Sequence, residues 1–135
     1  MNTQQQFIEN FANWAKTQGN ILGVFLVGSY ARNSAKDNSD IDFVVITENL
    51  GILLNNYAWT KQFGSVADTK KEDYGLVQSL RVFYKDGIEA EFGITTSKWL
   101  KTNPVDSGTQ KVLLGGYKIL FDKDDLLNKF ISTLK

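Results

Sequence analysis

The chain has 135 residues, and its 15 Lys and Arg balance its 15 Asp and Glu, so its formal net charge is zero. It contains no cysteine and no histidine, which excludes disulfides, thiolate nucleophiles, and imidazole bases or metal ligands. A neutral chain offers no broad electrostatic attraction to nucleic acid or to an anionic membrane. Any catalysis must therefore use carboxylates, Lys, Arg, Tyr, Ser or a bound metal.

The length predicts a single domain over residues 1–135, and a hydrophobic content of 42% is enough to build a sizeable core. The polar N-terminus lacks the apolar segment of a secretory signal, and no apolar run reaches membrane-spanning length. These features favour a cytoplasmic protein with no membrane partner.

An amphipathic helix is predicted over residues 3–18, where apolar side chains recur at helical spacing, and Gly19-Asn20 would end it. Residues 24–27 then form an apolar run of strand length, which Gly28-Ser29 interrupts. Residues 30–32 are expected to begin a short helix, and turn-forming residues precede a second buried strand over residues 41–46.

Two aspartates, Asp40 and Asp42, open this second strand. Side chains two positions apart on a strand point to the same face, so the two carboxylates repel each other unless a cation compensates them. Mg²⁺ is the usual cation, bound by one or two carboxylates together with substrate phosphates. Upstream, Gly28 permits close approach of a ligand, and the amides of Gly28 and Ser29 are suited to an anion. Arg32 could reach a phosphate or point into solvent, and the sequence leaves both alternatives open.

The middle of the chain predicts a short helix over residues 57–63 and a polar, charged loop over residues 66–75. A hairpin follows, with strands over residues 76–84 and 88–94 and a turn at Asp86-Gly87. Toward the C-terminus, a short helix over 107–114, a strand over 117–121 and a final helix capped by Asp124 or Asp125 are expected.

The second hairpin strand carries Glu89 and Glu91 on one face, between apolar residues of the other face. The family resemblance carried by the Gly-Ser and Asp-x-Asp motifs implies a third carboxylate beside the two aspartates, and this strand is where it would lie. Glu91 is the first choice because it lies further from the frayed turn. Glu89 points the same way and remains the alternative.

Gly28-Ser29, then ten residues, then Asp40-Ile41-Asp42, in a strand–helix–strand context, resembles the DNA polymerase beta-like nucleotidyltransferase superfamily. One departure is Asn33, where many members have glycine. The resemblance and the hairpin together imply an α/β (α+β) fold, with a mixed, largely antiparallel sheet and helices packed mainly on one face.

The resemblance also implies an activity, namely transfer of a nucleoside monophosphate from a Mg²⁺-bound nucleoside triphosphate, with ATP expected, to a hydroxyl acceptor on a small molecule or a protein. One or two Mg²⁺ ions would take part. The alternative is a non-catalytic module that binds nucleotide or a partner, such as an antitoxin-like protein paired with a toxin, and a second copy of the chain is another candidate partner. The implied residues are Asp40, Asp42 and Glu91 for the metal, Glu91 or Glu89 as the remaining catalytic carboxylate, and Gly28, Ser29 and Arg32 for the nucleotide.

Overall fold

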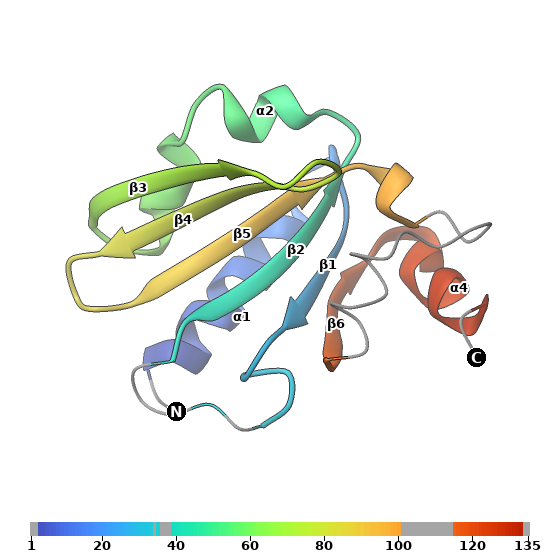
Figure 1. Cartoon of the computed structure of the whole chain (residues 1–135), viewed down its shortest axis with the longest axis horizontal. Helices are drawn as coiled ribbons and strands as arrows, with labels where there is room; N and C mark the ends of the chain where they lie inside the picture. Colours follow the sequence, from blue (N-terminus) through green and yellow to red (C-terminus); the bar gives the residue numbers. More distant parts are fainter. Residues whose placement is uncertain (1–2, 34, 36–38, 101–114, 134–135) are drawn as a thin grey trace.

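The computed structural model describes residues 3–33, 35, 39–100 and 115–133, and it is built around one twisted sheet (Figure 1). Six strands pair in the order β3-β4-β5-β2-β1-β6. The strands are β1 (Ile21–Val27), β2 (Ile41–Thr47), β3 (Val66–Asp73), β4 (Gln78–Tyr84), β5 (Glu89–Thr95) and β6 (Tyr117–Asp122). The helices are α1 (Thr3–Lys16), α2 (Leu50–Leu54) and α4 (Leu126–Thr133), with 3-10 helices η1 (Ala58–Phe63), η2 (Ser97–Leu100) and η3 (Lys123–Asp125).

Strand direction confirms the expected mixed sheet. Four of the pairings are antiparallel, and β2 with β5 is the parallel one. A parallel neighbour cannot be reached by a tight turn. The chain accordingly leaves β2, passes through α2, η1 and the β3–β4 pair, and returns to place β5 against β2.

Alternate residues of the central strands face two separate apolar clusters, as period-two side chains require. On one face, Val24 and Leu26 of β1 pack with α1, Leu53 of α2 and Trp59 of η1. On the other face, Phe25 and Val27 pack with Trp99 of η2 and with α4. The helices thus lie on both faces of the sheet, and Figure 1 shows α1 behind it and α4 beside β6.

The predicted hairpin is confirmed as β4 and β5, with Gly87 at a φ of 96° in the turn between them. The prediction of a loop over residues 66–75 is wrong, because residues 66–73 form the edge strand β3 paired with β4. This strand is mostly solvent-exposed on both sides, so its sequence has no apolar alternation. Charged residues on an edge strand also discourage pairing with other chains.

The start of the last helix differs from the prediction as well. Asp122 supplies the cap, because its carboxylate accepts hydrogen bonds from the amides of Leu127 at 2.7 Å and Asn128 at 3.0 Å. Asp124 and Asp125, which were expected there, adopt positive φ angles of 56° and 62° instead. The helix predicted over 107–114 lies outside the described residues. None of the helices in the described ranges has the length and apolar character needed to cross a membrane.

Candidate active site

The turn after β1 brings the backbone of Gly28 close to the side chain of Asp42 on β2. Gly28 has a φ of 74°, a conformation that side chains rarely adopt. A Cβ added at Gly28 would overlap a carboxylate oxygen of Asp42, so the Asp42 side chain would have to shift. The following residues form a turn in which the amides of Ala31 and Arg32 donate to the carbonyl of Gly28 at 3.1 and 3.2 Å.

The short helix expected after this turn is absent from residues 28–33, which form consecutive turns. Asn33 has a φ of 57°, a left-handed conformation that asparagine tolerates better than most residues. This is the position where the resemblance calls for glycine, and the local backbone explains how asparagine replaces it. The side-chain oxygen of Asn33 accepts a hydrogen bond from Lys118 Nζ at 2.8 Å, which ties the turn to β6.

The parallel pairing of β2 with β5 sets Asp42 directly opposite Glu91. On its other side, Asp42 is opposite Val27, the last residue of β1. Glu89 lies two residues before Glu91 on β5, level with the start of β2. The register therefore places Glu91, rather than Glu89, directly opposite Asp42.

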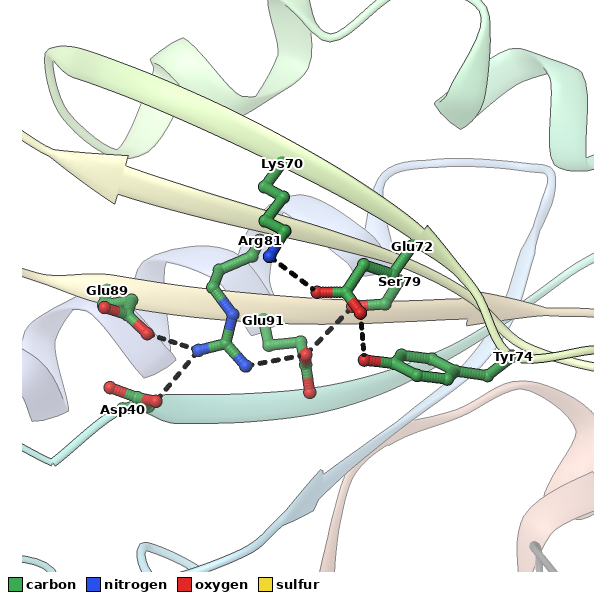
Figure 2. A network of polar contacts seen from close by, with 8 residues as sticks. All are labelled: Asp40, Lys70, Glu72, Tyr74, Ser79, Arg81, Glu89 and Glu91. Carbon is green, nitrogen blue, oxygen red and sulfur yellow. Dashed lines mark hydrogen bonds and ion pairs between the residues drawn. The ribbon is translucent and has the colours of Figure 1, made fainter.

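Arg81 of β4 lies at the centre of the acidic residues (Figure 2). Its Nη1 is 2.9 Å from Asp40 Oδ2 and also bonds Glu89, and its Nη2 is 2.9 Å from Glu91 Oε2. The Ser79 hydroxyl donates to the same Glu91 oxygen at 3.0 Å. Burial lowers the pKa of Arg81, but its bonds to the carboxylates outweigh that effect and raise it overall, so the guanidinium stays charged.

Sequence reasoning missed Arg81. A usable signal was present, because Arg81 occupies the polar face of β4, opposite the glutamates of β5. The β4–β5 register pairs Arg81 directly with Glu91. Opposite charges on paired positions of antiparallel strands attract each other, and the hairpin prediction could have identified this pair.

Asp42 is the carboxylate that Arg81 does not pair with. No hydrogen bond or ion pair joins it to another of the described residues. Burial, followed by the negative charges of Glu91 and Asp40, raises the pKa of Asp42 from 3.8 to about 6. The site thus holds excess negative charge at Asp42 when no cation other than Arg81 is present.

Two hollows meet at Asp42 and Glu91. One is a cleft of about 490 Å³ that also borders Gly28, Arg32 and Arg81. The Arg32 guanidinium donates to the carbonyl of Gly115 at 3.1 Å on the rim of this cleft. The other is a pocket of about 230 Å³, and its remaining lining is apolar or neutral: Val27, Phe43, Val44, Tyr74, Leu76, Val77, Ser79, Gly93 and Trp99.

The structure thus brings the residues predicted from the sequence to one end of the central strands. Gly28, Arg32, Asp40, Asp42 and Glu91 border one cleft. Glu89 joins them through Arg81. Ser29 follows Gly28 in the turn. Within the described ranges, however, no three of the carboxylates converge into a group that could hold a metal ion.

Similarity to known proteins identifies the family of the chain. The sequence model of the streptomycin adenylyltransferase family matches residues 1–134 of the chain. A Methanocaldococcus jannaschii protein provisionally named a protein adenylyltransferase is 28% identical over 118 residues, which cover 85% of this chain and 68% of that protein.

The fold also resembles that of a solved structure, an aminoglycoside 6-adenyltransferase from Bacillus subtilis, with a TM-score of 0.61 at 15% identity. The match covers 76% of this chain and 38% of that protein, so the chain spans well under half of its length. The chain belongs to the streptomycin adenylyltransferase family, whose enzymes transfer nucleotidyl groups from nucleoside triphosphates.

Proposed function

We propose that the protein transfers a nucleoside monophosphate, AMP in the first instance, from a Mg²⁺-bound triphosphate to a hydroxyl group. The observation that carries this proposal is the β2–β5 register, which sets Asp42 opposite Glu91 beside the Gly28 turn. Family membership supplies the triphosphate substrate, and this arrangement supplies groups suited to it.

The chemistry of the donor set fits Mg²⁺, although the described carboxylates do not converge around one point. Carboxylate oxygens are the protein ligands that this ion prefers, and Asp40, Asp42 and Glu91 would provide them. Burial, and after it the negative charges of Glu91 and Asp40, raise the pKa of Asp42, and a divalent cation would offset both effects. When bound, the ion supplies charge neutralisation on the phosphates and on the attacking and leaving oxygens.

The chain's own groups would position the substrates. The left-handed Gly28 and the turn after it form a backbone curve of the kind that binds anions, and we assign the phosphates to Gly28 and Ser29. Arg32 would add a charge-assisted contact once it exchanges its bond to the Gly115 carbonyl for a phosphate oxygen. Glu91, oriented by the Ser79 hydroxyl, would take the proton of the acceptor hydroxyl. Glu89 is the alternative group for that role.

The acceptor would enter through the pocket on the other side of Asp42 and Glu91. Because these two are its only charged lining residues among those described, the pocket suits a hydroxyl on an apolar body, such as an amino acid side chain, better than a polycationic aminosugar. The relative named as a protein adenylyltransferase agrees with a protein acceptor.

The test is incubation with labelled ATP, CTP, GTP and UTP plus Mg²⁺, in the presence of aminoglycosides, small aromatic and aliphatic alcohols, and proteins that copurify with the chain. Label should pass from ATP to an acceptor with the wild-type protein and not with Asp42→Asn. Nucleotide binding by calorimetry without transfer to any acceptor would instead support a non-catalytic module. Absence of Mg²⁺-dependent binding for every triphosphate would refute the proposal.

A further inference from the structure

Arg81 occupies the acidic side of the cleft in the way a bound cation would. Its two terminal nitrogens contact three carboxylates, those of Asp40, Glu89 and Glu91, and Figure 2 shows the guanidinium lying among them. Two of the three, Asp40 and Glu91, belong to the set proposed above for Mg²⁺. The structure therefore shows this set with an internal cation already in contact with it.

A guanidinium and a Mg²⁺ ion cannot use these oxygens equally well at the same time. Mg²⁺ requires oxygen ligands at about 2.0–2.1 Å in near-octahedral arrangement. The Asp40 and Glu91 oxygens instead face N–H donors at 2.9 Å. Two cations so close would also repel each other. The absence of a convergent three-carboxylate group among the described residues agrees with carboxylates that are arranged around Arg81.

A bound triphosphate would give the Arg81 guanidinium a second set of anionic partners. It borders the same cleft as Gly28 and Arg32, where the proposed function puts the triphosphate. The planar fork of a guanidinium matches phosphate oxygens as well as it matches carboxylates. Metal arriving alone would break the ion pairs of Arg81 without offering it a new partner. Metal that arrives with a triphosphate would give the carboxylates a new cation and give Arg81 a new anionic partner at the same time.

We propose that Arg81 is a built-in counter-cation: it excludes free metal from the carboxylates and, when metal and triphosphate arrive together, moves from Asp40 and Glu91 to the phosphates. This inference rests on the proposed function and deepens it. It makes metal binding and nucleotide binding mutually dependent, and linkage requires that dependence to be reciprocal. The opposing explanation is a scaffold, in which Arg81 only holds the carboxylates in place for the metal.

The two explanations predict opposite changes when Arg81 is replaced. The full chain is titrated calorimetrically with Mn²⁺ alone, and separately with Mn²⁺ plus a non-hydrolysable ATP analogue. Arg81→Gln should bind Mn²⁺ alone about tenfold more tightly than wild type, because the competing charge is gone. It should bind the Mn²⁺-loaded analogue about tenfold more weakly, because the phosphates lose a charged partner.

A matched control is Lys70→Gln, which removes one positive charge from the neighbouring β3. Lys70 is exposed and pairs with Glu72 at 3.3 Å, outside the acidic cluster. The affinities of Lys70→Gln for Mn²⁺ alone and for the Mn²⁺-loaded analogue should stay within about twofold of wild type. Arg81→Lys keeps the charge but not the fork, and should shift both affinities in the same directions as Arg81→Gln, by less. It provides the comparison if Arg81→Gln does not fold.

Each of the other outcomes counts against the proposed role of Arg81. Weaker Mn²⁺ binding by both Arg81 variants would show a scaffold and overturn the inference. An equal gain in Lys70→Gln would reduce the effect to general charge and also overturn it. If wild type binds the Mn²⁺-loaded analogue and the Arg81 variants match it in both titrations, the inference fails and the proposed function stands. If no form of the protein binds the loaded analogue, the proposed function fails as well.

Discussion

Replacing Asp42 with asparagine should stabilise the metal-free protein while it abolishes transfer. Burial and the charges of Glu91 and Asp40 raise the pKa of Asp42 from 3.8 to about 6. A carboxyl group with a raised pKa in the folded state binds its proton more tightly there than in the unfolded chain. Its ionisation therefore lowers the stability of the fold as the pH rises from about 4 to above 6, and asparagine avoids that loss.

The size of the gain follows from the shift in pKa. A change from 3.8 to about 6 corresponds to at most about 3 kcal/mol, at 1.36 kcal/mol per unit. Because Asp42 is only partly buried, solvent screening reduces this, and we expect about 1–2 kcal/mol at pH 7.5. With the usual unfolding entropy per residue, this gain raises the melting temperature of a chain of this length by about 3–7 °C.

The assay is thermal unfolding of wild type and Asp42→Asn between pH 4 and 8 without divalent metal. The gap in melting temperature should widen between about pH 4 and 6.5 and then stay constant. Glu9→Gln, which removes one exposed negative charge on α1 outside the acidic cluster, is the matched control for the loss of a single charge. Added Mg²⁺ and ATP should stabilise wild type but not Asp42→Asn. If Asp42→Asn melts below wild type at pH 7.5 without metal, Asp42 stabilises the fold and the charge argument is wrong.

Three further predictions concern the same end of the sheet. Glu91→Gln should lower the rate of transfer by about a hundredfold or more, and Glu89→Gln by less, because Glu91 is opposite Asp42. Single-turnover kinetics with labelled ATP would measure both rates, and the reverse order would assign the role to Glu89. Gly28→Ala should destabilise the protein by about 2 kcal/mol or more, from its positive φ and the collision with Asp42. Urea unfolding would check this value, and a change below about 0.5 kcal/mol would contradict the observed turn. Asn33→Val should cost about 1–2 kcal/mol in the same assay, whereas Asn33→Gly should stay within about 0.5 kcal/mol, since glycine tolerates the left-handed backbone; equal effects of the two variants would contradict this.

The arrangement of the candidate site could be expected from the sequence because strand periodicity is a strong local constraint. Once residues 41–46 are a strand, Asp40 and Asp42 must share a face. The Asp86-Gly87 turn likewise fixes Glu89 and Glu91 on one face of the strand that follows it. That β5 lies beside β2, with Glu91 opposite Asp42, is a non-local fact. It came from the resemblance, since no local pattern specifies which strands become neighbours.

The incorrect predictions have physical causes of their own. β3 is an edge strand whose residues are largely solvated, so its backbone pairing with β4 leaves no hydrophobic pattern to detect. The helix expected after Gly28 fails where Asn33 adopts a left-handed conformation, which no helix can continue through. The role of Arg81 depends on carboxylates from β2 and β5 as well as its own strand, and such convergence becomes visible only in three dimensions.

The pairing of β2 with β5 also bears on the order in which the candidate site is assembled. Asp42 and Glu91 are separated by roughly fifty residues of chain, and closing so long a loop is slow compared with forming the adjacent hairpins. During synthesis, β1 and β2 with the Gly28 turn emerge first and already present two unopposed aspartates. The partner carboxylate and the compensating arginine arrive together, on the β4–β5 hairpin. If these residues act as proposed, the site is complete only once that hairpin has paired with β2, so a partly made chain would carry the aspartate motif without its partners.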